Sequence, residues 1–240
     1  MPFTLSPQVD ALIAMQVGKL TEQLRKRREE ARRAYPFVTV SREFGCQGYP
    51  FSESLYKKLN ARSPEDAPWT VWDRELITKV SKDTGLNKEL IEALSGEHRS
   101  QLTQVRDEFF AGRPNDFKVY LAIFQTMSTM AMNGRVILMG HGSAIATKNL
   151  PRSVHVRLYG SLQFRLEGLM RAHHIPQEEA LRLARTREAE REDFVRRYAN
   201  ADVRDPLHYH LMFKNDTSTP DEMAETVIRF MEVKHLFEPR

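Results

Sequence analysis

Short apolar runs alternate with longer segments of helical periodicity from Phe37 onward, and this alternation constrains the fold more than any other feature of the chain. The apolar runs predict strands at residues 37–41, 69–72, 135–139, 153–159 and 210–213. The other segments predict helices at residues 51–60, 75–83, 88–94, 101–110, 116–132, 162–173, 177–197 and 221–233. Strands separated by helices require crossover connections. We therefore expect an α/β domain, with a parallel sheet of about five strands and helices on both faces.

The first 35 residues differ from the rest of the chain. Ser6 and Pro7 have the character of a helix start, and apolar residues then recur at helical spacing. We expect residues 1–35 to form an N-terminal helical extension and residues 36–240 to form the α/β domain. Within that domain, the predicted lid covers about residues 176–205.

The extension ends in the basic run RKRREEARR, Arg25 to Arg33. Such a run is a candidate surface for nucleic acid or an acidic partner. Glu29 and Glu30 interrupt it, which favours a solvated helix end with internal Glu–Arg pairs. Nucleic acid is therefore not an expected partner, whereas a homodimer contact through the extension is.

Composition excludes several classes of protein. The 36 Lys and Arg residues exceed the 32 Asp and Glu residues by a net charge of +4, which suits small anionic ligands. Cys46 is the single cysteine, which excludes an internal disulfide. The start MPFTLSPQVD does not resemble a secretory signal, and the apolar segment from Tyr120 to Met132 is too short and too polar to span a bilayer. We expect a cytoplasmic protein without a membrane partner.

A glycine-containing turn, SREFGCQGYPFS, follows the first predicted strand and precedes a helix. Gly45 and Gly48 allow successive N–H groups to point at an anion near the helix N-terminus. The full phosphate-binding motif is G-x-x-x-x-G-K-[ST], and here Tyr49-Pro50 stands where the lysine and hydroxyl residue are expected. Taken alone, the stretch is explained equally well by a strand-to-helix turn.

Four polar stretches follow predicted strands: SREFGCQG, WDRE, GHGSA and KNDT. In a parallel sheet with helices on both faces, ligands bind at the carboxyl ends of the strands. The four stretches are therefore expected to meet at one edge of the sheet, which makes that edge the candidate binding site.

Several of these segments resemble, in order, the cytidylate kinase-like proteins, a divergent branch of the P-loop nucleoside monophosphate kinases. SREFGCQGYPFSESLYKKL is similar to the opening of that family, whose loop also lacks the lysine, and WDRELI is similar to its second strand end. RVILMGHGSA, VHVRLYGSLQFRLEGLM and EEALRLARTREAERED with FVRRYANADVRDPLHYHLMF are similar to its later segments. The resemblance covers about Val38 to Met231.

This resemblance implies a P-loop kinase-like fold and an activity. The expected reaction transfers the γ-phosphoryl group of ATP to a (d)CMP-like acceptor, with nucleotides as the small-molecule partners and Mg²⁺ accompanying ATP. Two other hypotheses remain open. One is a catalytically degenerate regulatory protein of the same fold that binds a nucleotide or an anion. The other is an interaction protein that works through the basic N-terminal helix.

Guanidinium groups suit phosphoryl transfer because their paired N–H donors match phosphate oxygens. The candidate catalytic residues are Arg42, Arg165, Arg187 and Arg191, of which the resemblance supports Arg165 and Arg191 most directly. The alternative for Arg187 and Arg191 is a charged helix that faces solvent, since Glu188, Glu190 and Glu192 are interleaved with them.

The candidate nucleotide- and phosphate-binding residues are Gly45, Cys46, Gln47, Gly48, Tyr49, Asp73, Arg74, His141, Lys214 and Asn215. Asp73 could equally cap a helix, and Cys46 is interpreted as a small side chain, although loop N–H groups would lower its pKa. No metal ligand is assigned, with Ser52 the only candidate for Mg²⁺. Tyr49, His141 and Gly168 stand where the family has arginine, which leaves fewer cations for catalysis.

Overall fold

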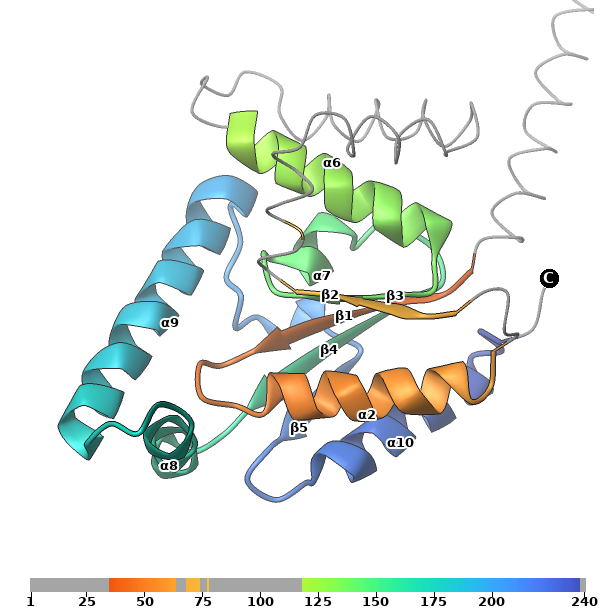
Figure 1. The fold of residues 1–240 in the computed structure, drawn as a ribbon. Coiled ribbons are helices and arrows are strands. Elements are labelled where there is room, and N and C mark those ends of the chain that lie inside the picture. Colours follow the sequence, from red (N-terminus) through yellow and green to blue (C-terminus); the bar gives the residue numbers. More distant parts are fainter. Residues whose placement is uncertain (1–34, 64–67, 74–76, 78–117, 238–240) are drawn as a thin grey trace, which may run out of the picture.

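The central feature of the protein is a parallel sheet, shown in Figure 1. The structure is a computed structural model that describes residues 35–63, 68–73, 77 and 118–237. The sheet has five strands in the order β2-β3-β1-β4-β5, and every neighbouring pair is parallel. The strands are β1 (Phe37–Arg42), β2 (Thr70–Trp72), β3 (Val136–Met139), β4 (Ser153–Tyr159) and β5 (Leu211–Lys214). This confirms the predicted α/β class and strand number.

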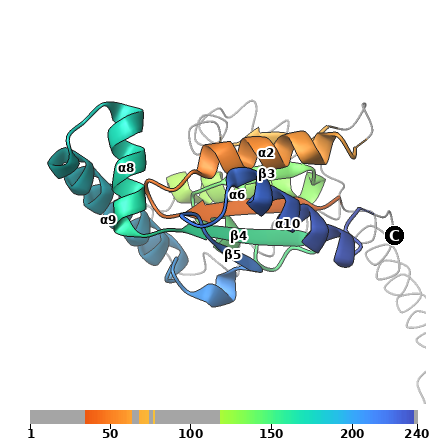
Figure 2. The same cartoon turned by 90° about the horizontal axis from the view of Figure 1, so that it is seen from below.

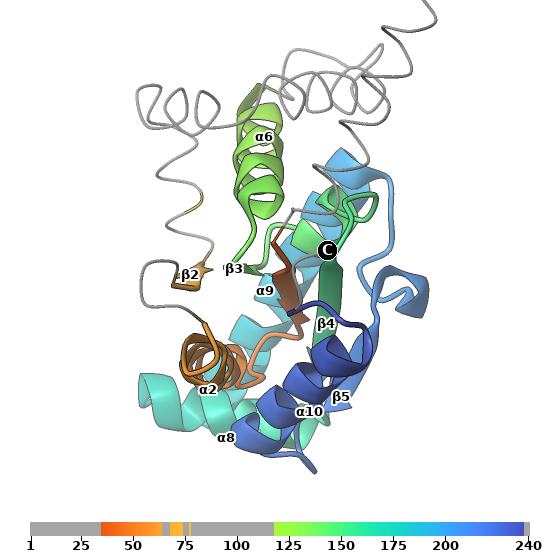
Figure 3. The same cartoon turned by 90° about the vertical axis from the view of Figure 1, so that its right-hand side faces the viewer.

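Helices cover both faces of the sheet, as Figures 1 and 3 show. The helices α2 (Gly48–Asn60) and α10 (Pro220–Val233) lie on one face. The helix α6 (Lys118–Asn133) and the short helix α7 (Ser143–Ala146) lie on the other. The pair α8 (Leu162–His173) and α9 (Gln177–Ala199) stands beyond the carboxyl ends of the strands, on the left of Figures 1 and 2.

The alternation of side chains along β1 divides the core in two. Val38 and Val40 face α2 and α10, in a cluster that also contains Phe51, Leu55 and Met223. The opposite cluster joins Phe37 and strand β3 to α6. Burial of these apolar side chains holds the helices on the sheet, so the carboxyl ends of the strands form one fixed edge.

The face of β1 that carries Phe37, and the matching face of β4, also carry polar residues, of which Thr39, His155 and Arg157 are buried. The register pairs Thr39 with His155 and Ser41 with Arg157. A hydrogen bond of 2.8 Å joins Thr39 Oγ1 to His155 Nδ1, and the His155 ring stacks on His210 with 5.0 Å between ring centroids. Burial, together with the nearby His210 and His208, lowers the pKa of His155 to about 3.

Most boundaries match the sequence-based prediction. The strand at Ser153–Tyr159 and the helix at Leu162–His173 are as predicted, whereas α2 begins three residues earlier than expected, at Gly48 rather than Phe51. The helix α7 was missed, because its four residues are too few to show a helical period. Residues 1–34 of the extension and the predicted helices at 88–94 and 101–110 lie outside the described residues, as does the predicted helix at 75–83 apart from Ile77, which is helical.

No helix of the described ranges combines the length and the apolar character that crossing a bilayer requires.

The buried His155 predicts how stability depends on pH. The folded protein holds this imidazole neutral, whereas an unfolded histidine takes up a proton below about pH 6.5. Stability is therefore full above pH 6.5 and falls as the pH drops from there toward 3. When the pH falls from 7.5 to 5.0, protonation of His155 in the unfolded state should lower the free energy of unfolding by roughly 2 kcal/mol.

Urea unfolding at the two pH values tests this expectation. His155→Asn keeps a polar partner for Thr39 and should show a smaller loss of unfolding free energy between pH 7.5 and 5.0 than the wild type. An equal loss in both proteins would show that His155 does not carry the effect.

Candidate functional site

The loop between β1 and α2 directs its N–H groups largely at protein acceptors. The N–H of Cys46 donates to Glu43 O and that of Gly48 donates to Cys46 O. Two further N–H groups reach distant side chains. Gln47 N donates to Asn215 Oδ1 and Phe44 N donates to Glu188 Oε2, both at 2.7 Å. Among these loop N–H groups, that of Phe44 therefore binds an anion, the Glu188 carboxylate of α9.

Gly45 is required by the packing of this loop against α8. Its φ is +95°, and an added Cβ would lie 2.7 Å from Arg165 O. Gly168, one turn along α8, is also close, because a Cβ there would lie 3.1 Å from Gly45 O. Glycine at position 45 thus has a structural explanation that needs no ligand, and the loop and α8 contact each other through their backbones.

Two predicted catalytic arginines converge on Glu188. Its Oε2 lies 3.6 Å from Arg191 Nη1 and 4.0 Å from Arg165 Nη1. Arg191 also donates to Arg42 O at 2.5 Å, and Arg165 Nε lies 3.5 Å from Glu43 Oε2. All of these side chains are largely buried, so their electrostatic interactions are stronger than those of surface pairs.

The third predicted arginine, Arg42, lies in the space left by two glycines. Its side chain comes within 3.2 Å of the Cβ position at Gly48 and within 2.9 Å of that at Gly140. The guanidinium therefore extends from the end of β1 toward the end of β3, between the loop and the Gly140–Gly142 turn. A side chain at position 140 would displace it.

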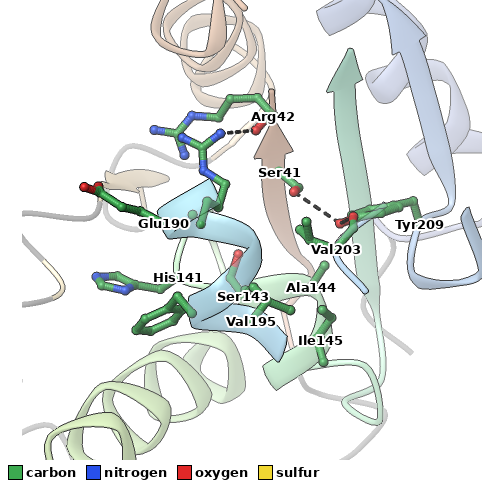
Figure 4. Close-up of a pocket in the computed structure, with 14 residues that line it drawn as sticks. Ser41, Arg42, His141, Ser143, Ala144, Ile145, Glu190, Val195, Val203 and Tyr209 are labelled. Carbon is green, nitrogen blue, oxygen red and sulfur yellow. Dashed lines mark hydrogen bonds between the residues drawn. The ribbon is translucent and has the colours of Figure 1, made fainter. Parts of the chain in front are cut away.

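A cavity of about 80 Å³ lies beside this arginine, between the ends of β1 and β3 and helix α9 (Figure 4). Its walls include Ser41, Arg42, His141, Arg191 and Tyr209. His141 is nearly buried, has a φ of 52°, and packs on Phe194 with 5.5 Å between ring centroids. The predicted site residues from β1, β3 and α9 are thus brought together around one cavity.

Other predicted residues lie at the same edge of the sheet. Tyr49 donates a hydrogen bond of 2.6 Å to Asp73 Oδ2, which links the loop to the end of β2. Asn215 is buried and holds the loop through Gln47, whereas the neighbouring Lys214 is half exposed and lies 3.9 Å from Asp216. Asn215 therefore orders the loop from the end of β5.

The thiol of Cys46 behaves differently from what the loop position alone indicates. Burial, followed by the Glu43 carboxylate, raises its pKa to about 12. The expectation that loop N–H groups would lower this pKa is wrong, because desolvation dominates. The thiol stays protonated near neutral pH, in line with the interpretation of Cys46 as a small side chain.

Two predicted residues lie apart from the cluster. The Arg187 guanidinium is half exposed and pairs with Glu190 at 2.9 Å, which matches the solvent-facing alternative. Arg74 lies outside the described residues. The structure also adds residues that were not predicted: Glu188, Ser41, Phe194 and Tyr209. In the sequence Glu188 is only one of several charges interleaved with arginines, and its contact with Phe44 spans 144 positions.

The position of Glu188 predicts that it competes with phosphate for the loop. Glu188→Gln keeps an acceptor for Phe44 N but removes the negative charge next to Arg165 and Arg191. Affinity for pyrophosphate, measured by calorimetry, should rise about three- to tenfold. Glu192→Gln is the matched control on the same helix, because Glu192 pairs only with Arg204 among the described contacts. Weaker pyrophosphate binding by Glu188→Gln would contradict the expectation.

Two solved structures are similar to this chain. An uncharacterized protein from Eubacterium ventriosum ATCC 27560 has a similar fold, with a TM-score of 0.56 and 15% identity over 82% of this chain and 98% of that one. Shikimate kinase from Bacteroides thetaiotaomicron matches with a TM-score of 0.41 and 14% identity, over 83% of this chain and 98% of its own.

No curated protein matches the sequence. The model of the cytidylate kinase-like family matches residues 37–217, which include the loop, the cavity and both helices beyond the sheet edge. The chain, with its nucleotide kinase-like fold, therefore belongs to the cytidylate kinase-like family.

Proposed function

We propose that the protein is a nucleoside monophosphate kinase that transfers the γ-phosphoryl group of ATP to a (d)CMP-like acceptor. The observation that supports this most is the convergence of Arg165 and Arg191 on the N–H side of the loop, where Glu188 now lies. Guanidinium and backbone donors gathered at one point are what a transferring phosphoryl group requires.

The loop, the arginines and helix α9 would each have a separate role in the proposed reaction. A phosphate that enters the loop takes the place of the Glu188 carboxylate at Phe44 N, and so inherits Arg165 and Arg191 as partners. Arg42 lies between the loop and the cavity, where it can bind an oxygen shared by donor and acceptor. Closure of α9 over the edge excludes water, which strengthens these contacts.

The described residues do not fit a resident metal site. They contain no group of three or more His, Cys, Asp or Glu side chains that could hold an ion. Ser52 has a hydroxyl without a hydrogen-bond partner, but the residue is only 1% exposed. Mg²⁺ is therefore treated as part of the ATP substrate, bound chiefly by its phosphates, and the role of Ser52 stays a prediction.

A second function is favoured by the same cluster. The carboxylate in the loop, and the absence of arginine at positions 49, 141 and 168, both weaken catalysis more than binding. The second proposal is therefore a regulatory protein of the same fold that binds a nucleotide or another anion without transferring a phosphoryl group.

Incubation of the purified protein with ATP, Mg²⁺ and a panel of nucleoside monophosphates tests the first function. Chromatography should detect nucleoside diphosphate, most with CMP or dCMP. Arg191→Ala should lower kcat about 100-fold or more, because it removes a cation from the developing charge. Arg196→Ala on the same helix is the control, since that side chain is exposed and pairs with Asp193.

Two other results would decide against the kinase. No diphosphate above a control without enzyme would contradict it. If the melting temperature nevertheless rises with a nucleotide, the regulatory function is supported instead.

A further inference from the structure

Arg157 on β4 carries a buried positive charge that the proposed reaction does not use. The residue is 2% exposed, and no Asp or Glu of the described residues lies within ion-pair distance of it. The pKa of the Asp202 carboxyl is lowered mainly by its hydrogen bonds to Arg204 and least by Arg157, and this carboxylate is about half exposed. A buried guanidinium without an acidic partner is costly to the fold, and such groups are usually paired with an anion.

The polar contacts of Arg157 lead toward the cavity. Its Nη1 donates to Ser41 Oγ at 3.3 Å, and its guanidinium lies 5.6 Å from the Tyr209 ring centroid. The Tyr209 hydroxyl lies 3.2 Å from Ser41 Oγ and 2.6 Å from Val203 O. Figure 4 shows the Ser41–Tyr209 contact on the cavity wall. Ser41 thus connects the buried charge to the cavity.

The directions of the hydrogen bonds that join Arg157, Ser41 and Tyr209 can be assigned. The shorter contact gives the Tyr209 hydrogen to Val203 O, so Ser41 donates to the Tyr209 oxygen and accepts from Arg157. Rotation of the Ser41 hydroxyl would redirect that hydrogen to a ligand in the cavity. Arg157 would remain bonded to the same oxygen and would polarise it.

Two arginines and one carboxylate are among the residues that line the cavity. They are Arg42, Arg191 and Glu190; Glu190 pairs with Arg187 at 2.9 Å, and Arg191 lies 3.6 Å from Glu188. A volume of about 80 Å³ is enough for a group of the size of a phosphate.

We propose that this cavity is a binding site for a small oxyanion, a phosphate or carboxylate group, and that Arg157 is its positioning residue, acting through Ser41. The anion supplies the negative charge that Arg157 lacks. The cavity shares Arg42 and Arg191 with the proposed reaction, but the inference does not require phosphoryl transfer, because it concerns anion binding next to Ser41 and Arg157, which that reaction does not use.

Melting temperatures in phosphate, sulfate, acetate and chloride at one ionic strength test the site. Phosphate or sulfate should stabilise the wild type, and acetate should do the same if a carboxylate group suffices. Arg157→Met should melt at a higher temperature than the wild type in chloride, because it removes the unpaired buried charge. When phosphate replaces chloride, the melting temperature of Arg157→Met should rise much less than that of the wild type. Its Kd for phosphate should be at least about fivefold weaker.

Two variants separate this site from the loop and from general structural effects. Arg157→Lys keeps a positive charge and should recover part of the phosphate response. Arg62→Gln changes a residue just after α2 and should leave the phosphate response of the wild type unchanged. Phosphate that binds only at the loop would stabilise the wild type and Arg157→Met equally, and this result would overturn the proposal. So would a lower melting temperature of Arg157→Met in chloride together with an unchanged phosphate response.

A structure of the wild type with phosphate decides the matter if Arg157→Met does not fold. The proposal expects a phosphate oxygen within hydrogen-bond distance of Ser41 Oγ. Occupation of the loop alone at saturating phosphate would overturn it. Turnover of nucleotides bears on the proposed kinase reaction instead, so the failure of either proposal can be recognised separately.

Discussion

The arrangement of the candidate site depends on the Glu188 carboxylate. It accepts a hydrogen bond from the loop at Phe44 N and lies next to Arg165 of α8 and Arg191 of α9. One negative charge thus joins the loop after β1 to the consecutive helices α8 and α9. Phosphate has the same sign and a larger charge, so the donors that hold α9 in place are also the donors that a nucleotide would need. The Glu188 carboxylate and a bound phosphate would thus compete for the same donors.

Much of the fold could be predicted because its signals are local. The period of each apolar run distinguishes strands from helices, and crossovers make the sheet parallel, which places the polar stretches at one edge. Arg42, His141, Asn215 and Asp73 meet there as that reasoning requires. The period of α9 likewise places Arg187 and Arg191 one turn apart, but it does not tell which of them the rest of the protein covers.

What could not be predicted depends on contacts between distant segments. Nothing near Glu188 indicates that its carboxylate reaches Phe44 N. The strand SVHVRLY alternates in the way that is typical of one buried and one solvent face. In the structure both faces are covered, so His155 and Arg157 are buried, and their unusual environments follow from tertiary packing alone. The pKa of Cys46 is another case: burial raises it most, the Glu43 carboxylate of the loop and Glu188 of α9 raise it further, and Arg165 of α8 opposes them.

The backbone contact between Gly45 and α8 has a consequence for how a ligand enters. The loop and α8 touch at Gly45, Arg165 and Gly168 without intervening side chains, so neither can move far without the other. Helix α9 packs on α8 through an apolar cluster that includes Leu166 and Ala184, and its polar link to the loop is the Glu188 carboxylate at Phe44 N. Admission of a phosphate is therefore a matter of exchanging ionic contacts along α9, so its rate should respond to salt, while the loop itself remains preorganised.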